Sequence, residues 1–232
     1  MFDSGGYSLK SRMETMHGDM GGAAAVIGAI RAIALEKLPV NVIAVVAACK
    51  NMISGDAYVP GDILFSMNGK KIEMLNSDAE GRLTLADALT YAIRKENAGS
   101  IIDIATLTGA AQGAVGVRSS AVFSNDEELY AEVEEASERA CEKIWRLPLD
   151  KELFPVIESE VADIQNSAQG STMGGGAIVA GLFLQEFVED HSWVHVDIAP
   201  VSWESKDIDY SIKGATGYGV SLLYETVKVI SR

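Results

Sequence analysis

Two carboxylates lie close together in the stretch 76–89, which reads NSDAEGRLTLADAL. Asp78 and Glu80 are two residues apart, so in an extended segment both side chains would point to the same side. A helical spacing of apolar residues begins after Arg82. Paired carboxylates are costly to bury unless a cation compensates them. The stretch indicates either an ordinary helix N-terminus, where acids favour the dipole, or part of a metal site.

Two further acids stand beside glycines that allow the backbone to approach closely. Asp3 lies in FDSGG and Asp19 in HGDMGG. Together with the acid pair they would repel one another and raise one another's pKa if they shared a pocket. Two divalent ions would neutralise them, and carboxylate oxygens suit Mg, Mn or Zn. The three histidines are scattered, and His195, between two valines, is interpreted as a hydrogen-bonded sheet residue.

Two cations accompany these acids in the sequence. Lys10 follows FDSGGYSL, and Arg82 comes two residues after Glu80. Beside a metal centre, such a cation can polarise a carbonyl group or hold an anion that acts as a base. The alternative for each is an ordinary salt bridge to the acids.

Composition limits the classes of protein. The 232 residues are 48% hydrophobic, which predicts one globular domain over 1–232. The net charge of −14 argues against binding to nucleic acid or to an anionic membrane. Cys49 and Cys141 are far apart, which fits a reducing cytoplasm. No signal peptide is apparent, and no run approaches the roughly 18 apolar residues of a membrane helix.

Helical and strand patterns alternate along the chain. Helices are predicted over 20–36, 83–96, 126–142 and 218–230, with another opening at the glycines 174–176. Strands are predicted over 40–47, 63–67, 70–74, 100–105, 121–124 and 193–198, with Asn68-Gly69 as a two-residue hairpin turn between the second and third. Nearly continuous apolar strands indicate an α/β fold in which a mainly parallel or mixed sheet is sandwiched between helices in three layers.

In such sheets the chemistry lies beyond the carboxyl ends of the strands. The turn 106–109 directly follows the strand 100–105, and the acid pair follows the predicted hairpin. Together with Asp3, these groups are expected to meet at one edge of the sheet. A nucleotide site at the glycines 174–176 is disfavoured because no Lys-Ser/Thr follows them. A serine hydrolase centred on Ser4 lacks a GxSxG elbow.

Seven segments together resemble one family. MFDSGGYSLK, HGDMGGAAAVIGAIRA, NSDAEGRLTLADAL, IDIATLTGA, GGGAIVAGLFL, WVHVDIAP and TGYGVSLL are similar to the catalytic domain of the leucyl (cytosol) aminopeptidase family, in this order from the first residue to the last. The octapeptide NSDAEGRL is close to that family's diagnostic NTDAEGRL. The resemblance implies an enzyme that removes N-terminal residues, leucine above all, from peptides with a water molecule activated by two metal ions, Zn or Mn and possibly Mg.

The resemblance also implies roles for matched residues. Asp3 and Glu80 would bridge both metals, Asp78 would complete the more exchangeable site, and Asp19 would bind the tighter one. Lys10 would contact the substrate carbonyl, and Arg82 would hold a bicarbonate ion as the base. The remaining matches would bind substrate: Thr106, Leu107 and Gly109 its backbone, and Met16 its side chain. Members of the family form cytoplasmic hexamers, so a homo-oligomer is expected.

Two departures from the family pattern accompany the resemblance. The lysine of GKGxxFDSGG that binds the tight metal would fall before Met1, as would the smaller N-terminal domain. Pro200 stands where glycine is usual. The sequence therefore leaves an alternative open: a domain truncated at its N-terminal edge that folds and assembles without turnover, holding at most one metal tightly.

Overall fold

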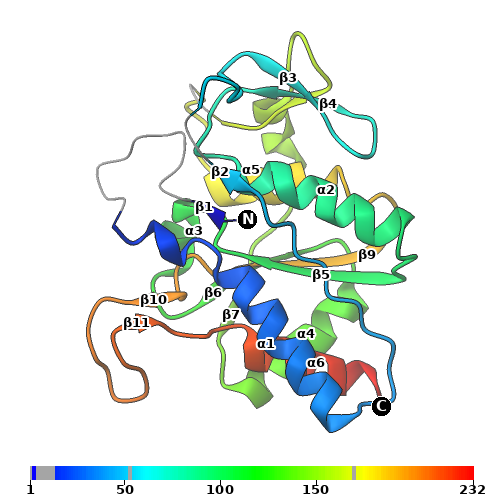
Figure 1. The fold of residues 1–232 in the computed structure, drawn as a ribbon, viewed down its shortest axis with the longest axis vertical. Coiled ribbons are helices and arrows are strands. Elements are labelled where there is room, and N and C mark those ends of the chain that lie inside the picture. Colours follow the sequence, from blue (N-terminus) through cyan, green and yellow to red (C-terminus); the bar gives the residue numbers. More distant parts are fainter. Residues whose placement is uncertain (1, 4–13, 52–53, 169–170) are drawn as a thin grey trace.

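The computed structural model describes residues 2–3, 14–51, 54–168 and 171–232 (Figure 1). A four-stranded sheet in the order β5-β9-β6-β7 forms its centre. Its strands are β5 (Ser100–Ala105), β9 (Ser192–Asp197), β6 (Ser120–Ser124) and β7 (Ile144–Arg146). β5 pairs with β9 and β6 with β7 in parallel, whereas β6 and β9 are antiparallel. The sheet is therefore mixed.

Helices cover both faces of this sheet, as the predicted three-layer α/β fold requires. One face packs against α2, α3 and α5, and the other packs against α1, α4 and α6. Their bounds are α1 (Gly21–Glu36), α2 (Gly81–Arg94), α3 (Gly109–Val115), α4 (Glu127–Ala140), α5 (Gly176–Gln185) and α6 (Val220–Ile230). Short segments connect them: η1 (Met16–Gly18), η2 (Lys151–Ile157), β10 (Trp203–Glu204) and β11 (Gly214–Ala215).

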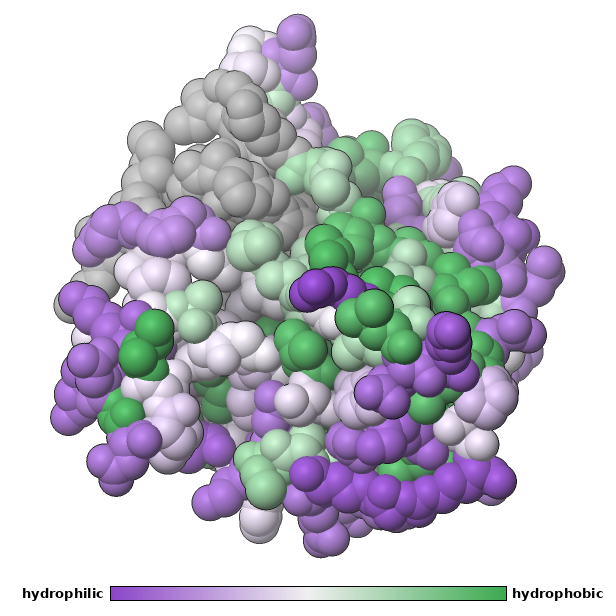
Figure 2. Space-filling view, turned by 60° about the horizontal axis from the view of Figure 1, so that its bottom comes forward, coloured by the Kyte–Doolittle hydropathy of each residue, from purple (hydrophilic) through white to green (hydrophobic). Residues whose placement is uncertain are grey.

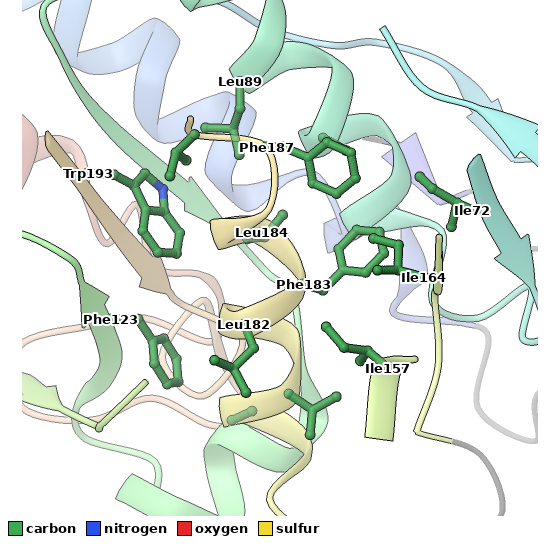
Figure 3. Packing of buried hydrophobic residues seen from close by; sticks show 14 of the residues in the cluster. Ile72, Leu89, Phe123, Ile157, Ile164, Leu182, Phe183, Leu184, Phe187 and Trp193 are labelled. Atoms are coloured by element: carbon green, nitrogen blue, oxygen red, sulfur yellow. The ribbon is translucent and has the colours of Figure 1, made fainter. Parts of the chain in front are cut away.

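Alternation along the strands divides the core into two clusters. Phe123 and Trp193 face α5, where Phe183 and Phe187 pack with their ring centroids 5.2 Å apart (Figure 3). All four of these aromatic side chains are fully buried. Each contributes roughly 1.5–3 kcal/mol by leaving water. The intervening residues, among them Val194, face the opposite layer of helices.

Helix α1 packs its small residues against the sheet. Its buried positions are Gly22, Ala25, Ala29 and Ile33. At Gly22 an added Cβ atom would lie 2.0 Å from the carbonyl oxygen of Ile104 in β5. Helix and strand are therefore in backbone contact at this point.

Gly22→Ala is expected to destabilise the fold, because the clash involves backbone on both sides. Overpacking of this kind costs about 1–3 kcal/mol or more. Urea unfolding measures the change. Gly113→Ala in α3 is the matched control, since an added Cβ meets nothing within 4 Å there. Equal stability of both variants and the wild type would contradict this packing.

The predicted hairpin is confirmed, but it belongs to a second sheet. β3 (Asp62–Phe65) and β4 (Lys71–Met74) are antiparallel, and β8 (Ile164–Gln165) joins β4 in parallel. Residues 66–70 form the loop, which is longer than the predicted two-residue turn because Phe65 pairs with Lys71. Gly69 adopts a φ of 98°, as a turn position of this kind requires.

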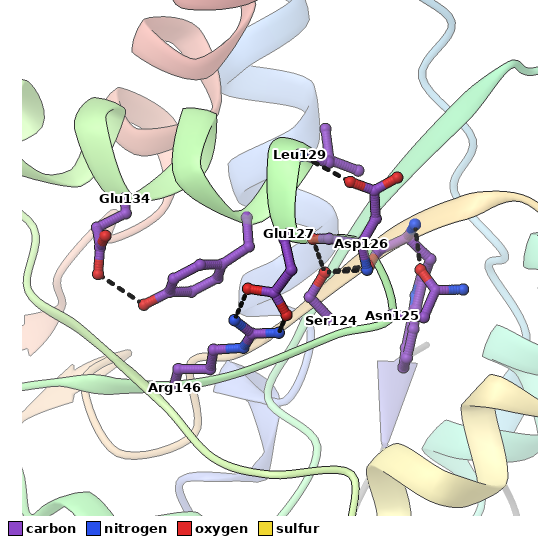
Figure 4. A network of polar contacts seen from close by, with 9 residues as sticks. Ser124, Asn125, Asp126, Glu127, Leu129, Glu134 and Arg146 are labelled. Atoms are coloured by element: carbon purple, nitrogen blue, oxygen red, sulfur yellow. Dashed lines mark hydrogen bonds and ion pairs between the residues drawn. The ribbon is translucent and has the colours of Figure 1, made fainter.

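The helix predicted over 126–142, a segment rich in Asp and Glu, is confirmed as α4. Asp126 caps the helix by accepting a hydrogen bond from the backbone N–H of Leu129 at 2.9 Å (Figure 4). Arg146 of β7 forms two hydrogen bonds with Glu127, and its guanidinium lies 4.4 Å from the ring centroid of Tyr130. The acids are thus accommodated at the helix N-terminus and on its solvated side.

The strand predicted over 40–47 is wrong. Residues 41–49 have no regular secondary structure. The next strand, β2 (Lys50–Asn51), pairs in parallel with β1 (Phe2–Asp3). A strand needs hydrogen-bonding partners as well as apolar side chains. Here Ile43 is 52% exposed, although its apolar neighbours predict burial on both faces.

Apolar side chains also reach the surface on α1. Ile27 is 59% and Leu35 71% exposed. Figure 2, which turns the bottom of Figure 1 forward, shows hydrophobic residues gathered near the centre of that face and hydrophilic residues along its lower edge. In the described part of the chain, the stretch Met16–Glu36 is the one helical stretch long and apolar enough to cross a membrane by length and composition. Its packing against β5 is that of a sheet-covering helix.

Candidate active site

A cavity of about 650 Å³ runs along β5 to its carboxyl end, where the N-termini of α1 and α2 also line it. Residues 43–47 also line this cavity. Eight of the ten residues predicted from the sequence line this one cavity: Met16, Asp19, Asp78, Glu80, Arg82, Thr106, Leu107 and Gly109. Segments more than eighty residues apart in the chain therefore converge as the strand-end rule predicts.

The other two predicted residues lie beyond what the structure describes. Lys10 falls among residues 4–13, outside the described ranges. Asp3 is described by its backbone, which pairs with Asn51 in the parallel β1–β2 ladder. Within the described part of the chain, no group of three or more His, Cys, Asp or Glu side chains is arranged to hold a metal ion. Of the four acids predicted as metal ligands, the structure thus describes the side chains of three, Asp19, Asp78 and Glu80.

The acid pair occupies a turn and not the extended segment assumed above. The backbone N–H of Asp78 donates to Asn76 Oδ1 at 2.9 Å, and that of Ala79 donates to the Asn76 carbonyl at 3.1 Å. Asp78 is exposed, whereas Glu80 at the start of α2 is 5% exposed. The two carboxylates therefore differ in burial although both line the cavity.

Asn166, which the sequence reasoning missed, holds this turn in place. Its side chain is fully buried. Its Oδ1 accepts from the backbone N–H groups of Leu75 and Asn76, at 2.9 and 3.2 Å. Its Nδ2 donates to the carbonyls of Asn76 and Ala79, at 2.8 and 3.2 Å. One amide thus fixes the backbone on both sides of the turn that carries Asp78.

Asn166→Asp is expected to misplace the turn, because a carboxylate cannot donate to the two carbonyls that Nδ2 now satisfies. Leaving buried acceptors unsatisfied costs about 1–3 kcal/mol each. The expected result is a lower urea midpoint. Asn125→Asp serves as the control, since Asn125 is exposed and belongs to the distant start of α4. Unchanged stability in the Asn166 variant would contradict this role.

Asp19 is fixed from β5. It follows η1, and its Oδ1 accepts a hydrogen bond from Thr106 Oγ1 at 2.6 Å. The sequence places Thr106 one residue after the strand, so the contact ties the start of α1 to the strand end. Met16 lies in η1 on the same wall of the cavity.

Arg82 is the buried cation of the site. It is 9% exposed, and its guanidinium lies 5.9 Å from the ring centroid of Phe183. Burial lowers the pKa of Arg82 to about 10, and the charges of Asp197 and Glu80 oppose that shift. The side chain therefore stays protonated at neutral pH. Its Nε has no hydrogen-bond partner among the described residues.

Asp197, at the carboxyl end of β9, is a second residue that the sequence reasoning missed. Its carboxylate accepts from the backbone N–H groups of Leu107 and Thr108 at 3.1 and 3.0 Å, and from Thr108 Oγ1 at 2.7 Å. It also accepts from the N–H of Ala199 at 3.1 Å. The sequence signal that could have identified it is an acid at the end of an apolar strand, in WVHVDIAP.

Comparisons with known proteins agree with this geometry. Residues 1–224 match the model of the "Cytosol aminopeptidase family, catalytic domain". The chain is 55% identical over 229 residues to a protein of Clostridium perfringens named "Probable cytosol aminopeptidase", covering 97% of this chain and 45% of that one. For the protein of the same name in Clostridium tetani, the identity is 53%, with 98% and 47% covered.

A solved structure is similar over the whole chain. The protein described as "Bottromycin maturation enzyme BotP" superimposes with a TM-score of 0.88 at 39% sequence identity, covering 99% of this chain and 50% of that one. The chain thus spans about half the length of the curated relatives and of the solved protein that it matches.

Proposed function

Because the chain belongs to the cytosol aminopeptidase family, we propose that residues 1–232 form the catalytic domain of an aminopeptidase that removes N-terminal residues, leucine above all, from peptides. The observation that carries this proposal is the convergence of eight matched residues on one cavity at the end of β5. The cavity contains acids, a buried cation and the polar strand end that such a reaction needs.

Divalent metal ions are the proposed cofactors, with Asp19, Asp78 and Glu80 as ligands together with Asp3. The donor set fits, because the three described acids present carboxylate oxygens to one cavity. Buried Glu80 in particular favours a nearby positive charge. When bound, two such ions, Zn or Mn and possibly Mg, would activate water and polarise the scissile carbonyl near neutral pH.

The remaining residues would bind and orient the substrate. The turn 106–109 supplies backbone groups to an extended peptide, and Met16 supplies an apolar contact for the first side chain. Lys10 would stabilise the negative charge that develops on the carbonyl oxygen. Arg82 would hold a bicarbonate ion that can accept a proton. Its protonated guanidinium, whose Nε has no hydrogen-bond partner among the described residues, supports this role.

The relatives' name includes the word cytosol, and we propose the same compartment for this chain. Assembly into a homo-oligomer, a hexamer by resemblance, is also proposed. The apolar side chains that α1 exposes support an interface. Binding of nucleic acid or of a membrane is not part of the proposal.

Leucine release from leucine amide tests the proposed function. The chain is expected to release leucine in the presence of Mn²⁺ or Zn²⁺ and to lose this activity after chelation. N-acetyl-leucine amide is the matched control substrate, because an aminopeptidase requires a free amino group. Metal binding without any hydrolysis would favour the alternative of a domain that folds and assembles without turnover.

A further inference from the structure

Three charged side chains lie along one face of the β5–β9 ladder. Asp103 and His195 are partners in the parallel register, and Asp197 lies two residues beyond His195 on the same face. Asp103 is 8%, His195 0% and Asp197 1% exposed. Charges are rarely placed this deeply without one another's support, so the three form a unit.

His195 is held on one side. Its Nδ1 lies 2.6 Å from Asp103 Oδ1, and the other oxygen of Asp103 accepts from Trp193 Nε1 at 2.6 Å. The imidazole is stacked with the rings of Phe123 and Trp193, at centroid separations of 6.1 and 6.3 Å. The predicted sheet histidine is thus confirmed. Its Nε2, however, is buried without a hydrogen-bond partner among the described residues.

The charges favour an imidazolium next to Asp197. Burial lowers the pKa of His195, and so does the charge of Arg82. The charge and hydrogen bond of Asp103 and the charge of Asp197 raise the pKa, and the net shift is upward. Burial raises the pKa of Asp197. The charge of His195 and the hydrogen bonds from Thr108, Ala199 and Leu107 act to lower it. His195 and Asp197 lie two residues apart on one face of β9, so in its protonated form His195 places a positive charge near the Asp197 carboxylate and favours its ionised form.

Asp197 in turn fixes the strand end. Its carboxylate accepts the backbone N–H groups of both Leu107 and Thr108, two consecutive residues of the turn 106–109. This turn lines the cavity at Thr106, Leu107 and Gly109. The carbonyl groups of the turn are oriented by the same contacts, because each peptide unit is planar.

We propose that His195, held by Asp103, is a positioning residue for substrate binding: it supports the Asp197 carboxylate, which holds the turn 106–109 in the conformation that receives the peptide backbone. This inference rests on the proposed function for its substrate. His195 does not touch the substrate, so its removal is expected to weaken binding more than the chemical step.

Hydrogen exchange tests the positioning without any assay of activity. In His195→Asn, the amides of Leu107 and Thr108 are expected to exchange about tenfold to hundredfold faster, relative to the amides of α4, because hydrogen bonds to a charged acceptor weaken. Asp103→Asn is expected to have the same effect, although Asp103 contacts neither residue in the described hydrogen bonds. If His195→Asn fails to fold, Asp103→Asn decides.

Val122→Ala is the matched control, since Val122 is fully buried in the same sheet but faces the opposite cluster. It lowers stability without altering the three charges. Faster hydrogen exchange at Leu107 and Thr108, relative to the amides of α4, in His195→Asn and Asp103→Asn but not in Val122→Ala supports the inference. Equal acceleration at Leu107 and Thr108 in Val122→Ala, or none in His195→Asn and Asp103→Asn, would overturn it.

Kinetics with leucine amide separate the two proposals. For His195→Asn we expect KM to rise about tenfold while kcat falls by less than about threefold. A fall confined to kcat would contradict a role in binding. If the wild-type chain with bound metal releases no leucine, the proposed function fails, and the exchange measurement alone decides the role of His195.

Discussion

Replacing Glu80 by glutamine is expected to abolish peptide hydrolysis, with kcat/KM falling by about 10³-fold or more. The substitution keeps the size of a side chain that is 5% exposed and removes its charge. An amide is a poor ligand for a divalent ion compared with a carboxylate, and it would no longer balance the positive charge that we propose in the cavity. Steady-state kinetics and elemental analysis of the same sample measure the effect.

Glu160→Gln is the control for this experiment. Glu160 is an exposed carboxylate that does not line the cavity, so its substitution removes the same charge from the protein at another place. Its activity and metal content are expected to equal those of the wild type. Substantial hydrolysis by the Glu80 variant would show that the acid pair is not the metal site.

Arg82→Ala is expected to lower both activity and stability. Its removal takes a buried positive charge away from the neighbourhood of Asp197 and Glu80. Removing one of several opposite buried charges costs up to about 3–5 kcal/mol. If Arg82 also positions the base, kcat should fall by about 10²-fold or more. Urea unfolding and steady-state kinetics measure the two effects separately.

Arg82→Lys distinguishes these contributions. The lysine keeps the positive charge but lacks the planar, forked geometry that binds an anion such as bicarbonate. We expect most of the stability to be retained while kcat stays low. Wild-type kcat in Arg82→Ala would instead show that another group serves as the base and that Arg82 is structural.

The sequence predicted the elements whose burial is visible in local periodicity. β5 and β9 were found because their apolar runs are short and bounded by polar residues, and α4 because its run of acids is typical of a solvated helix face. The run 40–47 has the same apolar character, yet it does not pair. Strand pairing depends on the backbone of a distant segment, which local composition does not encode.

The site was predicted more completely for residues on the cavity wall than for those behind it. Asp78 and Glu80 were found by their spacing, and the turn 106–109 by its position directly after β5. The resemblance added Met16. Asn166 and Asp197 act through backbone groups about ninety residues away in the chain. From sequence alone, a single polar residue in a loop or at the end of an apolar strand cannot be distinguished from a surface residue until its hydrogen-bond partners are known. Only the fold brings them together.

Thermal melting during a metal titration tests the central claim, that the acids around the cavity bind divalent ions. Wild-type protein is expected to melt about 5–10 °C higher with Mn²⁺ or Zn²⁺ at a hundred times its Kd, since ligand that binds only the folded state stabilises it by about 2.7 kcal/mol. The Asp78→Asn/Glu80→Gln double variant should show no such shift. A wild-type melting curve that stays unchanged up to millimolar concentrations of both metals would contradict the account.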